Sequence, residues 1–372
     1  MAGWSYTTND VLTNKRWAKL MLVQMMQETW FLRLASKEDG LPIQIIDDLQ
    51  KHSGDQVTFG LSNLLSGRGV MDLATLTGNE EAPQTFGDSL FIHELAHATL
   101  LVGPISNQRV LFDQRKIGRG RLADWYAART DHAAANQLGS FTPQTDVAYT
   151  GLQATIGVST SGVVNGGSGR QILPSGVNDA ASINSTMPFV LGFIDTAVNR
   201  AKSLTTGIRP VKIGGRSFFI LVMHNSQVTD MRQNVTTGQW LDIQKAAMTG
   251  GDIGDNPIWW QAIGMYHGTL LHENPRITNS VSNAGLAVAN TKRAIFLGAQ
   301  AAMLAFGRAS GETQKFQWLE ELRDYGRQLG IGVSAIWGLK KTVFNNQDFA
   351  AMALDTFGLD TDALNSAQTN SQ

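Results

Sequence analysis

His93, Glu94 and His97 match the pattern H-E-x-x-H, the clearest chemical motif in this chain of 372 residues. On a helix, histidines four residues apart share one face and can bind a single zinc ion, while the glutamate activates a bound water. On a strand, at about 3.3 Å per residue, the two histidines lie roughly 13 Å apart and cannot share an ion. The local pattern of apolar residues does not decide between helix and strand.

A zinc site also needs a third protein ligand, and the sequence supplies none nearby. The extended form of the motif requires glycine at 100 and histidine at 103, where this chain has Leu100 and Gly103. The next glutamate after Glu94 is Glu273. We therefore interpret His93 and His97 as polar residues of an interface segment and predict no catalytic residue, no cofactor and no metal. A zinc hydrolase that uses His93, Glu94 and His97 is the alternative.

The composition excludes several other kinds of site. The chain has no cysteine, which rules out disulfides, thiolate nucleophiles and cysteine-ligated metals. Its 30 basic and 31 acidic residues give a net charge of −1, unlike a strongly basic nucleic-acid coat. Charged residues make up only 16%, which is typical of a chain that hides surface in its core or against other copies. No apolar run reaches the roughly 18 residues of a membrane span, so we expect a soluble protein without a membrane partner.

Two N-terminal segments are predicted to need a surface to lie on. Residues 15–33 have helical spacing, with an apolar stripe formed by Leu20, Val23, Met26 and Trp30. This pattern predicts an amphipathic helix, packed on its own chain or lying as an arm on a neighbouring subunit. Strand-like residues 57–61 and the apolar run 88–102 flank a long polar excursion, which predicts an extended hairpin. Such a hairpin buries too little surface to be stable alone.

The rest of the chain mixes helices and strands, so the predicted fold class is α+β. Residues 105–139 form one long predicted helix, which Gly118 and Gly120 are expected to break or bend. Basic residues along it alternate with acidic ones, which favours a salt-bridged face or a subunit contact over nucleic-acid binding. Further predicted elements are a flexible glycine-rich and serine-rich connection (157–176), strands at 216–222 and 331–337, helices at 240–248 and 316–329, and a disordered tail after 363.

Five strings then resemble one known family in their order and spacing. They are 76–81 (LTGNEE), 108–115 (QRVLFDQR), 122–125 (LADW) with Arg129 and Asp131, 272–276 (HENPR) and 335–344 (AIWGLKKTVF). Together they are similar to the Enquatrovirus-type major capsid proteins of tailed bacteriophages, from about residue 28 to about residue 358. That family lacks a zinc motif at 93–97, which supports the interpretation of these residues as non-catalytic.

The resemblance implies the tailed-phage major capsid fold. Its parts would be an N-terminal arm (1–37), an extended loop hairpin (38–103) and a peripheral domain (104–182) whose spine helix spans about 105–139. A mainly axial domain (183–330) and a C-terminal segment (331–372) of returning peripheral strands and polar tail would follow. The charged positions that match the family are carried over as structural or inter-subunit contacts: Arg109, Arg115, Asp124, Arg129 and Asp131.

The resemblance also implies a function. The chain would be a structural subunit that self-assembles as pentamers and hexamers into an icosahedral shell around double-stranded DNA. Its partners would be other copies of itself, portal and scaffolding proteins, and weakly and non-specifically bound DNA, with a decoration protein left open. It would assemble in the bacterial cytoplasm and end in the virion. An encapsulin-like compartment shares the fold and stays open as a further alternative.

Overall fold

The computed structural model describes residues 20–360 apart from 22, 27, 48, 50–53, 63–64, 66, 73–74, 103–107, 110–113, 160–168, 205–206, 214, 234–261, 309–314 and 326. Several predicted segments therefore lie outside the described residues. They are the start of the arm, the middle of the glycine-rich connection, the helix at 240–248 and the tail after 363.

The described part contains helices of very different length and many strands. The helices are α3 (Gln114–Leu138), α4 (Leu191–Ser203) and α5 (Asn225–Gln233), with 3-10 turns η1 (Phe31–Leu34), η3 (Val147–Tyr149) and η4 (Ala180–Ser182). The strands are β1 (Ala35–Ser36), β2 (Ile43–Ile46), β3 (Gln56–Ser62), β4 (Thr85–Phe91), β5 (His93–Val102), β6 (Gln171–Ile172), β7 (Val211–Ile213), β8 (Arg216–Met223), β9 (Ala262–Tyr266), β10 (Thr269–Glu273), β11 (Thr291–Leu297), β12 (Ala302–Phe306), β13 (Phe316–Arg323), β14 (Gln328–Lys341), β15 (Val343–Phe344), β16 (Gln347–Asp348) and β17 (Ala351–Phe357). No described helix has both the length and the apolar character that a membrane crossing requires.

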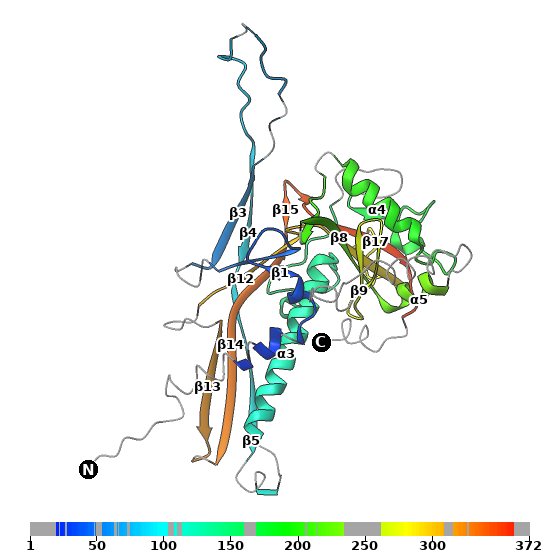
Figure 1. The fold of residues 1–372 in the computed structure, drawn as a ribbon. Coiled ribbons are helices and arrows are strands. Elements are labelled where there is room, and N and C mark those ends of the chain that lie inside the picture. Colours follow the sequence, from blue (N-terminus) through cyan, green and yellow to red (C-terminus); the bar gives the residue numbers. More distant parts are fainter. Residues whose placement is uncertain are drawn as a thin grey trace.

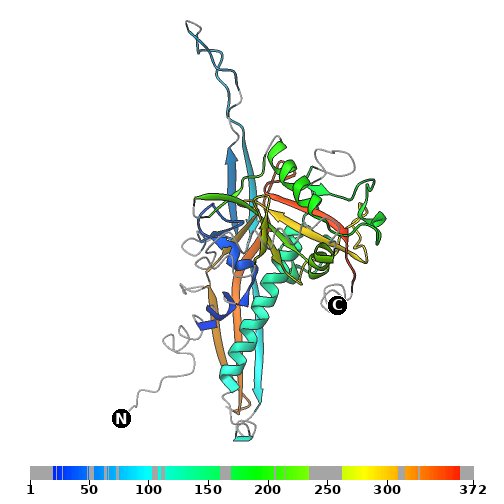
Figure 2. The ribbon, with the colours of Figure 1, turned by 45° about the vertical axis from the view of Figure 1, so that its right-hand side comes forward.

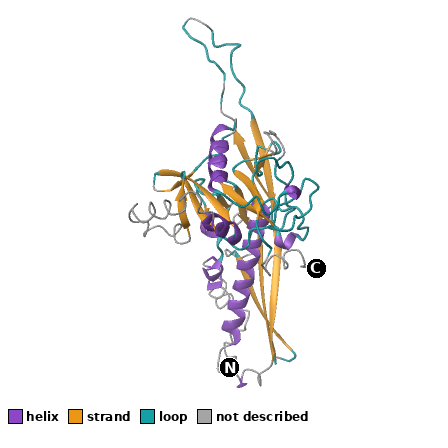
Figure 3. Ribbon diagram, turned by 90° about the vertical axis from the view of Figure 1, so that its right-hand side faces the viewer, coloured by secondary structure: helices purple, strands orange, loops and turns teal. Residues whose placement is uncertain are grey.

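One sheet, here called the long sheet, runs the length of α3 (Figures 1 and 3). Its order is β1-β2-β12-β14-β13, with β5 paired to β14. Strand β14 is the central strand of this sheet, because β5 pairs with its residues 328–337 and β12 with its residues 337–341. Alternate residues of β14, from Ile331 to Leu339, are buried. Period-two burial of this kind is typical of a sheet packed on one face.

Helix α3 continues through Gly118 and Gly120, so the predicted break is wrong. The reason is packing: a Cβ at Gly118 would lie 3.4 Å from side-chain carbons of both Thr99 and Ile331. Glycine there lets the helix lie close to the sheet, and the tertiary contact outweighs a cost of about 1 kcal/mol in helix propensity. Further along, the Tyr126 hydroxyl lies within 2.6 Å of the Leu95 carbonyl oxygen and 3.1 Å of that of Val333. The helix is thereby bonded to two neighbouring strands.

A second sheet, here called the lobe sheet, has the order β6-β17-β11-β8-β10-β9, with β7 paired to β8. It forms the wider lobe beside the long sheet, with α4 and α5 around it (Figures 1 and 2). Every residue of β11 is buried, as are six of the seven residues of β17. Strand β8, predicted at 216–222, is confirmed with one residue more.

Each of the two sheets takes strands from distant parts of the chain. Strands β12 and β13 precede residue 331 but pair in the long sheet, whereas β17 follows it and pairs with β11 in the lobe sheet. The predicted helix at 316–329 is also wrong, since residues 316–323 are strand β13. Phe316, Trp318 and Glu320 all point to the buried side, and the register with β14 runs over eight residue pairs. Long-range pairing outweighs the local helical spacing.

The hairpin is confirmed but is shorter than predicted. Strands β3 and β4 pair in register from Gln56 and Phe91 to Ser62 and Thr85. Residues 93–102 leave this pairing and join β14 as β5, because Leu95 and Leu101 there pack against the main core. The hairpin and its loop project beyond both sheets (Figure 1).

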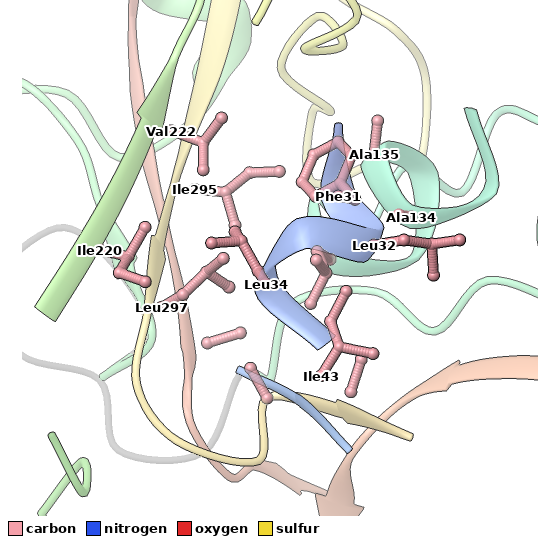
Figure 4. Close-up of a cluster of buried hydrophobic side chains, with 14 of the residues drawn as sticks. Phe31, Leu32, Leu34, Ile43, Ala134, Ala135, Ile220, Val222, Ile295 and Leu297 are labelled. Atoms are coloured by element: carbon pink, nitrogen blue, oxygen red, sulfur yellow. The ribbon is translucent and has the colours of Figure 1, made fainter. Parts of the chain in front are cut away.

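The N-terminal segment ties α3 to the lobe sheet. In Figure 4, Phe31, Leu32 and Leu34 of η1 lie between Ala134 and Ala135 of α3 and the apolar residues of β8 and β11. All three η1 side chains are buried. This short turn therefore fills the junction between the two layers, and its removal would leave a cavity.

Candidate interaction surfaces

The zinc hypothesis for His93, Glu94 and His97 is wrong. The three residues lie on strand β5, where residues 93 and 97 are roughly 13 Å apart at about 3.3 Å per residue. His97 stacks on Trp125 of α3, with ring centroids 4.3 Å apart. Glu94 lies on the opposite face of the strand. Across the described ranges, no three His, Asp or Glu side chains gather closely enough to hold a metal ion.

The loop between β3 and β4 carries large apolar side chains that nothing in the described chain covers. Leu65, Met71 and Leu76 are between 64% and 73% exposed. The loop lies at the far end of the hairpin, away from both sheets (Figure 2). Exposed apolar residues grouped on a projecting element mark a surface that binds another protein.

A second surface, here called the open face, is the side of the long sheet that faces away from α3. Its outward residues include Ala96, Ala98 and Leu100 of β5, Gly330, Gly332 and Ser334 of β14, and Gln317, Leu319 and Glu321 of β13. Leu319, Gly332 and Ala98 are aligned across the three strands. Leu319 is 50% exposed and Leu100 is 46% exposed. Gly330 and Gly332 add no side chain to the central strand of this face, and the exposed Glu321 lies opposite Gly330 in the register.

A third surface lies on the N-terminal helical residues between 20 and 28. Met21 and Met25 are buried against the core, whereas Leu20, Val23 and Met26 are exposed. Three residues of the predicted apolar stripe therefore point outward, whereas its fourth residue, Trp30, packs against the core. Among the described residues, this helical segment has one apolar face covered by its own chain and exposed apolar side chains on another.

The charged residues predicted as contacts divide into distinct roles. Arg115, near the start of α3, donates from Nε to Glu320 Oε1 at 2.8 Å and forms a second bond to the other carboxylate oxygen. The side chain of Glu320 is fully buried and also accepts from the Trp318 indole. This bidentate pair joins the helix to strand β13, so within the described chain Arg115 is a structural contact.

Asp131 holds the N-terminal segment on α3. Its carboxylate accepts the backbone N–H groups of Trp30 and Phe31 at 3.2 and 3.0 Å, and Arg276 lies 3.7 Å away. Burial raises the pKa of Asp131, and the two backbone hydrogen bonds oppose that shift. The carboxylate thus connects η1, α3 and the turn after β10.

The remaining predicted contacts lie nearer the surface. The Arg129 guanidinium lies over the Tyr149 ring, 3.6 Å from its centroid, and close to Trp125. Asp124 lies 3.8 Å from Arg121, and its carboxylate raises the pKa of Glu28 by accepting a hydrogen bond from the protonated Glu28 carboxyl. Arg109 is exposed. Asp124 and Arg129 are half-buried.

Two charged groups important for the hairpin were missed from sequence alone. The Lys340 ammonium pairs with Asp88 and donates to the Ser89 carbonyl at 2.8 Å, which fixes β4 to the end of β14. A cavity of about 460 Å³ is lined by residues of β3 together with Ile45 and Phe344, and at its edge Phe59 of β3 contacts Phe344 with ring centroids 5.9 Å apart. Lys340 and Asp88 are 252 residues apart, so no local pattern connects them. The base of the hairpin is therefore held on both strands, because Lys340 pairs with Asp88 of β4 and Val57 of β3 packs in a small core with Met303 and Ala305.

A comparison of the chain with protein families matches residues 5–361 to a family described as phage capsid protein. The major capsid protein of Pseudomonas phage KPP25 is 23% identical over 379 aligned residues, which cover 94% of this chain and 96% of that protein.

Solved structures agree in fold. The capsid of Ralstonia phage GP4 superimposes with a TM-score of 0.76 at 25% identity, covering 97% of this chain and 96% of that one. The capsid asymmetric unit of cyanophage Pam1 gives a TM-score of 0.69 at 17% identity, covering 97% of each chain.

Proposed function

The chain belongs to the phage capsid protein family, and on this premise we propose that it assembles as pentamers and hexamers into an icosahedral shell. It is a major capsid protein, a structural part of the virion and not an enzyme. The shell would enclose the double-stranded DNA genome of a tailed bacteriophage. Closed symmetry limits such an assembly to a finite particle.

The single observation that carries this proposal is the projecting β3–β4 hairpin with its exposed apolar loop. Leu65, Met71 and Leu76 are largely exposed among the described residues, and a neighbouring subunit would cover them. The open face around Leu319 offers apolar surface of the kind such a loop needs. We assign the loop of one subunit to the surface of its neighbour, where mutual burial supplies cohesion without disulfides.

The sheets suggest how the domains divide. The long sheet with α3 would form the peripheral domain, with α3 as the spine helix, and the lobe sheet would form the axial domain around the five-fold and six-fold centres. The exposed stripe of Leu20, Val23 and Met26 would belong to the N-terminal arm on a neighbouring subunit. Arg109, Asp124 and Arg129 are assigned to inter-subunit contacts on the basis of their position near the surface.

Further partners follow from the same assignment. A portal and a scaffolding protein would act during assembly in the host cytoplasm. The near-neutral charge of −1 fits weak, non-specific contact with packaged DNA, since tight binding would need many basic residues.

The experiment that tests the proposal shortens the hairpin. Ser62 and Thr85 are the last paired residues, so replacing 63–84 by Asn-Gly closes β3 and β4 with a two-residue turn. We expect a folded subunit with an unchanged circular dichroism spectrum that no longer builds regular shells. Size-exclusion chromatography and electron microscopy measure the outcome.

A milder variant serves as the matched control. Leu286→Ser removes an equally exposed leucine from a turn of the lobe, far from the hairpin in sequence. We expect it to assemble, whereas a combined change of Met71 and Leu76 to serine in the hairpin loop should reduce assembly. Normal particles from the shortened hairpin would refute the role given to the loop.

A further inference from the structure

We propose that Lys292 and Asn279 form an intramolecular isopeptide bond, with Asp360 as the group that moves the proton. This covalent link would lie entirely within one subunit. It would join the start of β11 to the loop before it. The proposal rests on the geometry of three side chains and does not depend on how the shell is assembled.

The three side chains are already in contact. Lys292 Nζ lies 2.9 Å from Asn279 Oδ1, one bond from the amide carbon that would be attacked. Asp360 bridges the pair: its Oδ1 accepts from Lys292 Nζ at 2.8 Å and its Oδ2 accepts from Asn279 Nδ2 at 3.0 Å. One carboxylate therefore touches both the nucleophile and the leaving group.

Backbone bonds hold this arrangement on both sides. The Arg293 N–H donates to the Thr278 carbonyl at 3.1 Å, directly beside the Lys292–Asn279 contact. The Asn290 N–H donates to Asp360 Oδ2 at 2.7 Å, and the Gly358 N–H donates to the Asn290 carbonyl. The reacting groups thus start from a geometry near that of attack, which lowers the entropic part of the barrier.

The lysine is also confined and removed from solvent. Its side chain is fully buried. Gly358 packs directly against it, since a Cβ at that position would lie only 2.6 Å from Lys292 Cγ. A buried amine beside a carboxylate can pass its proton to that carboxylate and become a nucleophile.

Another buried lysine lacks the same surroundings. Lys341 contacts Asp348, the Ser140 hydroxyl and the Gly157 carbonyl, with no side-chain amide among these partners. A buried lysine–aspartate pair is therefore not enough by itself. The amide of Asn279 is what distinguishes the Lys292 pair.

The reaction balances without any other reactant. The Lys292 ammonium gives one proton to Asp360, and the free amine forms a C–N bond to Cγ of Asn279. The bond from Cγ to Nδ2 then breaks, and Nδ2 takes up two protons, the one held by Asp360 and a second one that the newly bonded Lys292 nitrogen gives up, so that it leaves as ammonium. Asp360 ends as a carboxylate, and no group is oxidised or reduced.

The bond would close the segment 279–292 into a covalent ring. A ring of this kind restricts the unfolded chain and so raises the stability of the lobe, although the source of such stabilisation depends on the model used. The chain has no cysteine and so cannot form a disulfide, but a lysine and an asparagine can supply an isopeptide cross-link.

Mass spectrometry of the denatured full chain tests the proposal. We expect a mass lower than the sequence mass by one ammonia molecule. Chymotrypsin cleaves after Leu286, between the two linked residues, and should release two peptides joined through Lys292 and Asn279. Lys292→Arg, Asn279→Ala and Asp360→Asn should each restore the full mass.

The controls separate this bond from other ammonia losses. Lys340→Arg changes a lysine that has an aspartate partner but no amide, and it should keep the mass deficit. Cyclisation of an asparagine to a succinimide also loses ammonia, but it would persist in Lys292→Arg and would give no joined peptides. A wild-type chain of full mass, or a deficit without joined peptides, overturns the proposal.

Discussion

The lobe sheet and the long sheet differ in how far their own chain covers their side chains. In the lobe sheet, all seven residues of β11 are buried, and the fully buried carboxylate of Asp355 is satisfied by Arg293, Ser280 and Gln171. In the long sheet, α3 covers one face, while Leu100 and Leu319 stay about half exposed on the other. The first region is complete within one chain, and the second is not.

This difference separates the residues that fold the subunit from those that assemble it. A satisfied polar network in a closed core stabilises one conformation of the single chain. An apolar face left open contributes little to the single chain and gains its energy only when a neighbour covers it. Mutations in the two regions should therefore have different effects on stability and assembly.

The largest expected effect comes from Asp355→Ala in the lobe. Removing this carboxylate leaves the Arg293 guanidinium buried and without its bidentate partner. We expect the free energy of unfolding to fall by about 3–5 kcal/mol. Urea denaturation of the subunit measures it. The matched control is Glu321→Ala, which removes the partner of Arg323 from an exposed pair on the long sheet and should cost less than about 1 kcal/mol. Equal losses of unfolding free energy in the two variants would contradict the proposed difference between the two sheets.

A smaller effect should appear at acid pH through His132 on α3, the helix between the two sheets. Burial, with the positive charges of Arg276 and Arg129, lowers the pKa of His132 to about 4. Because the folded pKa lies below the unfolded value of about 6.5, the contribution of neutral His132 is complete above pH 6.5 and is lost as the pH falls towards 4.

His132→Gln should remove this loss. Between pH 7 and pH 4, we expect the wild type to lose up to about 3 kcal/mol more unfolding free energy than the variant. Urea denaturation at a series of pH values gives the difference, and Thr130→Ser controls for a change on the same helix. Parallel curves for wild type and His132→Gln would contradict the prediction.

The smallest effect on the single chain is expected from Leu319→Ser on the open face. The residue is half exposed, so the free energy of unfolding should change by no more than about 0.5 kcal/mol. Assembly should weaken nevertheless, because the apolar area that a neighbour covers is lost. The protein concentration at which particles form measures this, with Leu319→Ile as the control that keeps the apolar area. If Leu319→Ser forms particles at the same protein concentration as the wild type, the open face is not part of the interface.

Several elements were predictable because their local pattern agrees with their final environment. The alternation of Ile331, Val333, Ala335 and Trp337 corresponds to the buried side of β14, since one face of that strand packs on α3. The apolar run at 216–222 corresponds to the buried strand β8. The charged face of α3 is visible in the sequence, but the partner of Arg115, Glu320, lies 205 residues away and no local pattern indicates it.

Predictions failed where a distant segment decided the outcome. Residues 316–329 have helical spacing, but pairing with β14 makes residues 316–323 a strand. The spacing of the motif at 93–97 fits a zinc-binding helix as well as a strand, but in the structure these residues pair with β14 as a strand. In each case the local preference is worth less than the hydrogen bonds and side-chain packing of a long strand pair.

By itself, the sequence determined the α+β class, the absence of cysteine chemistry, the long helix and the hairpin, because these depend on composition and local periodicity. Only the tertiary structure decided which apolar stripe points outward, which carboxylate meets which cation, and that His93 and His97 lie along a strand. Those outcomes depend on contacts between residues far apart in the chain, and such contacts leave no local signal.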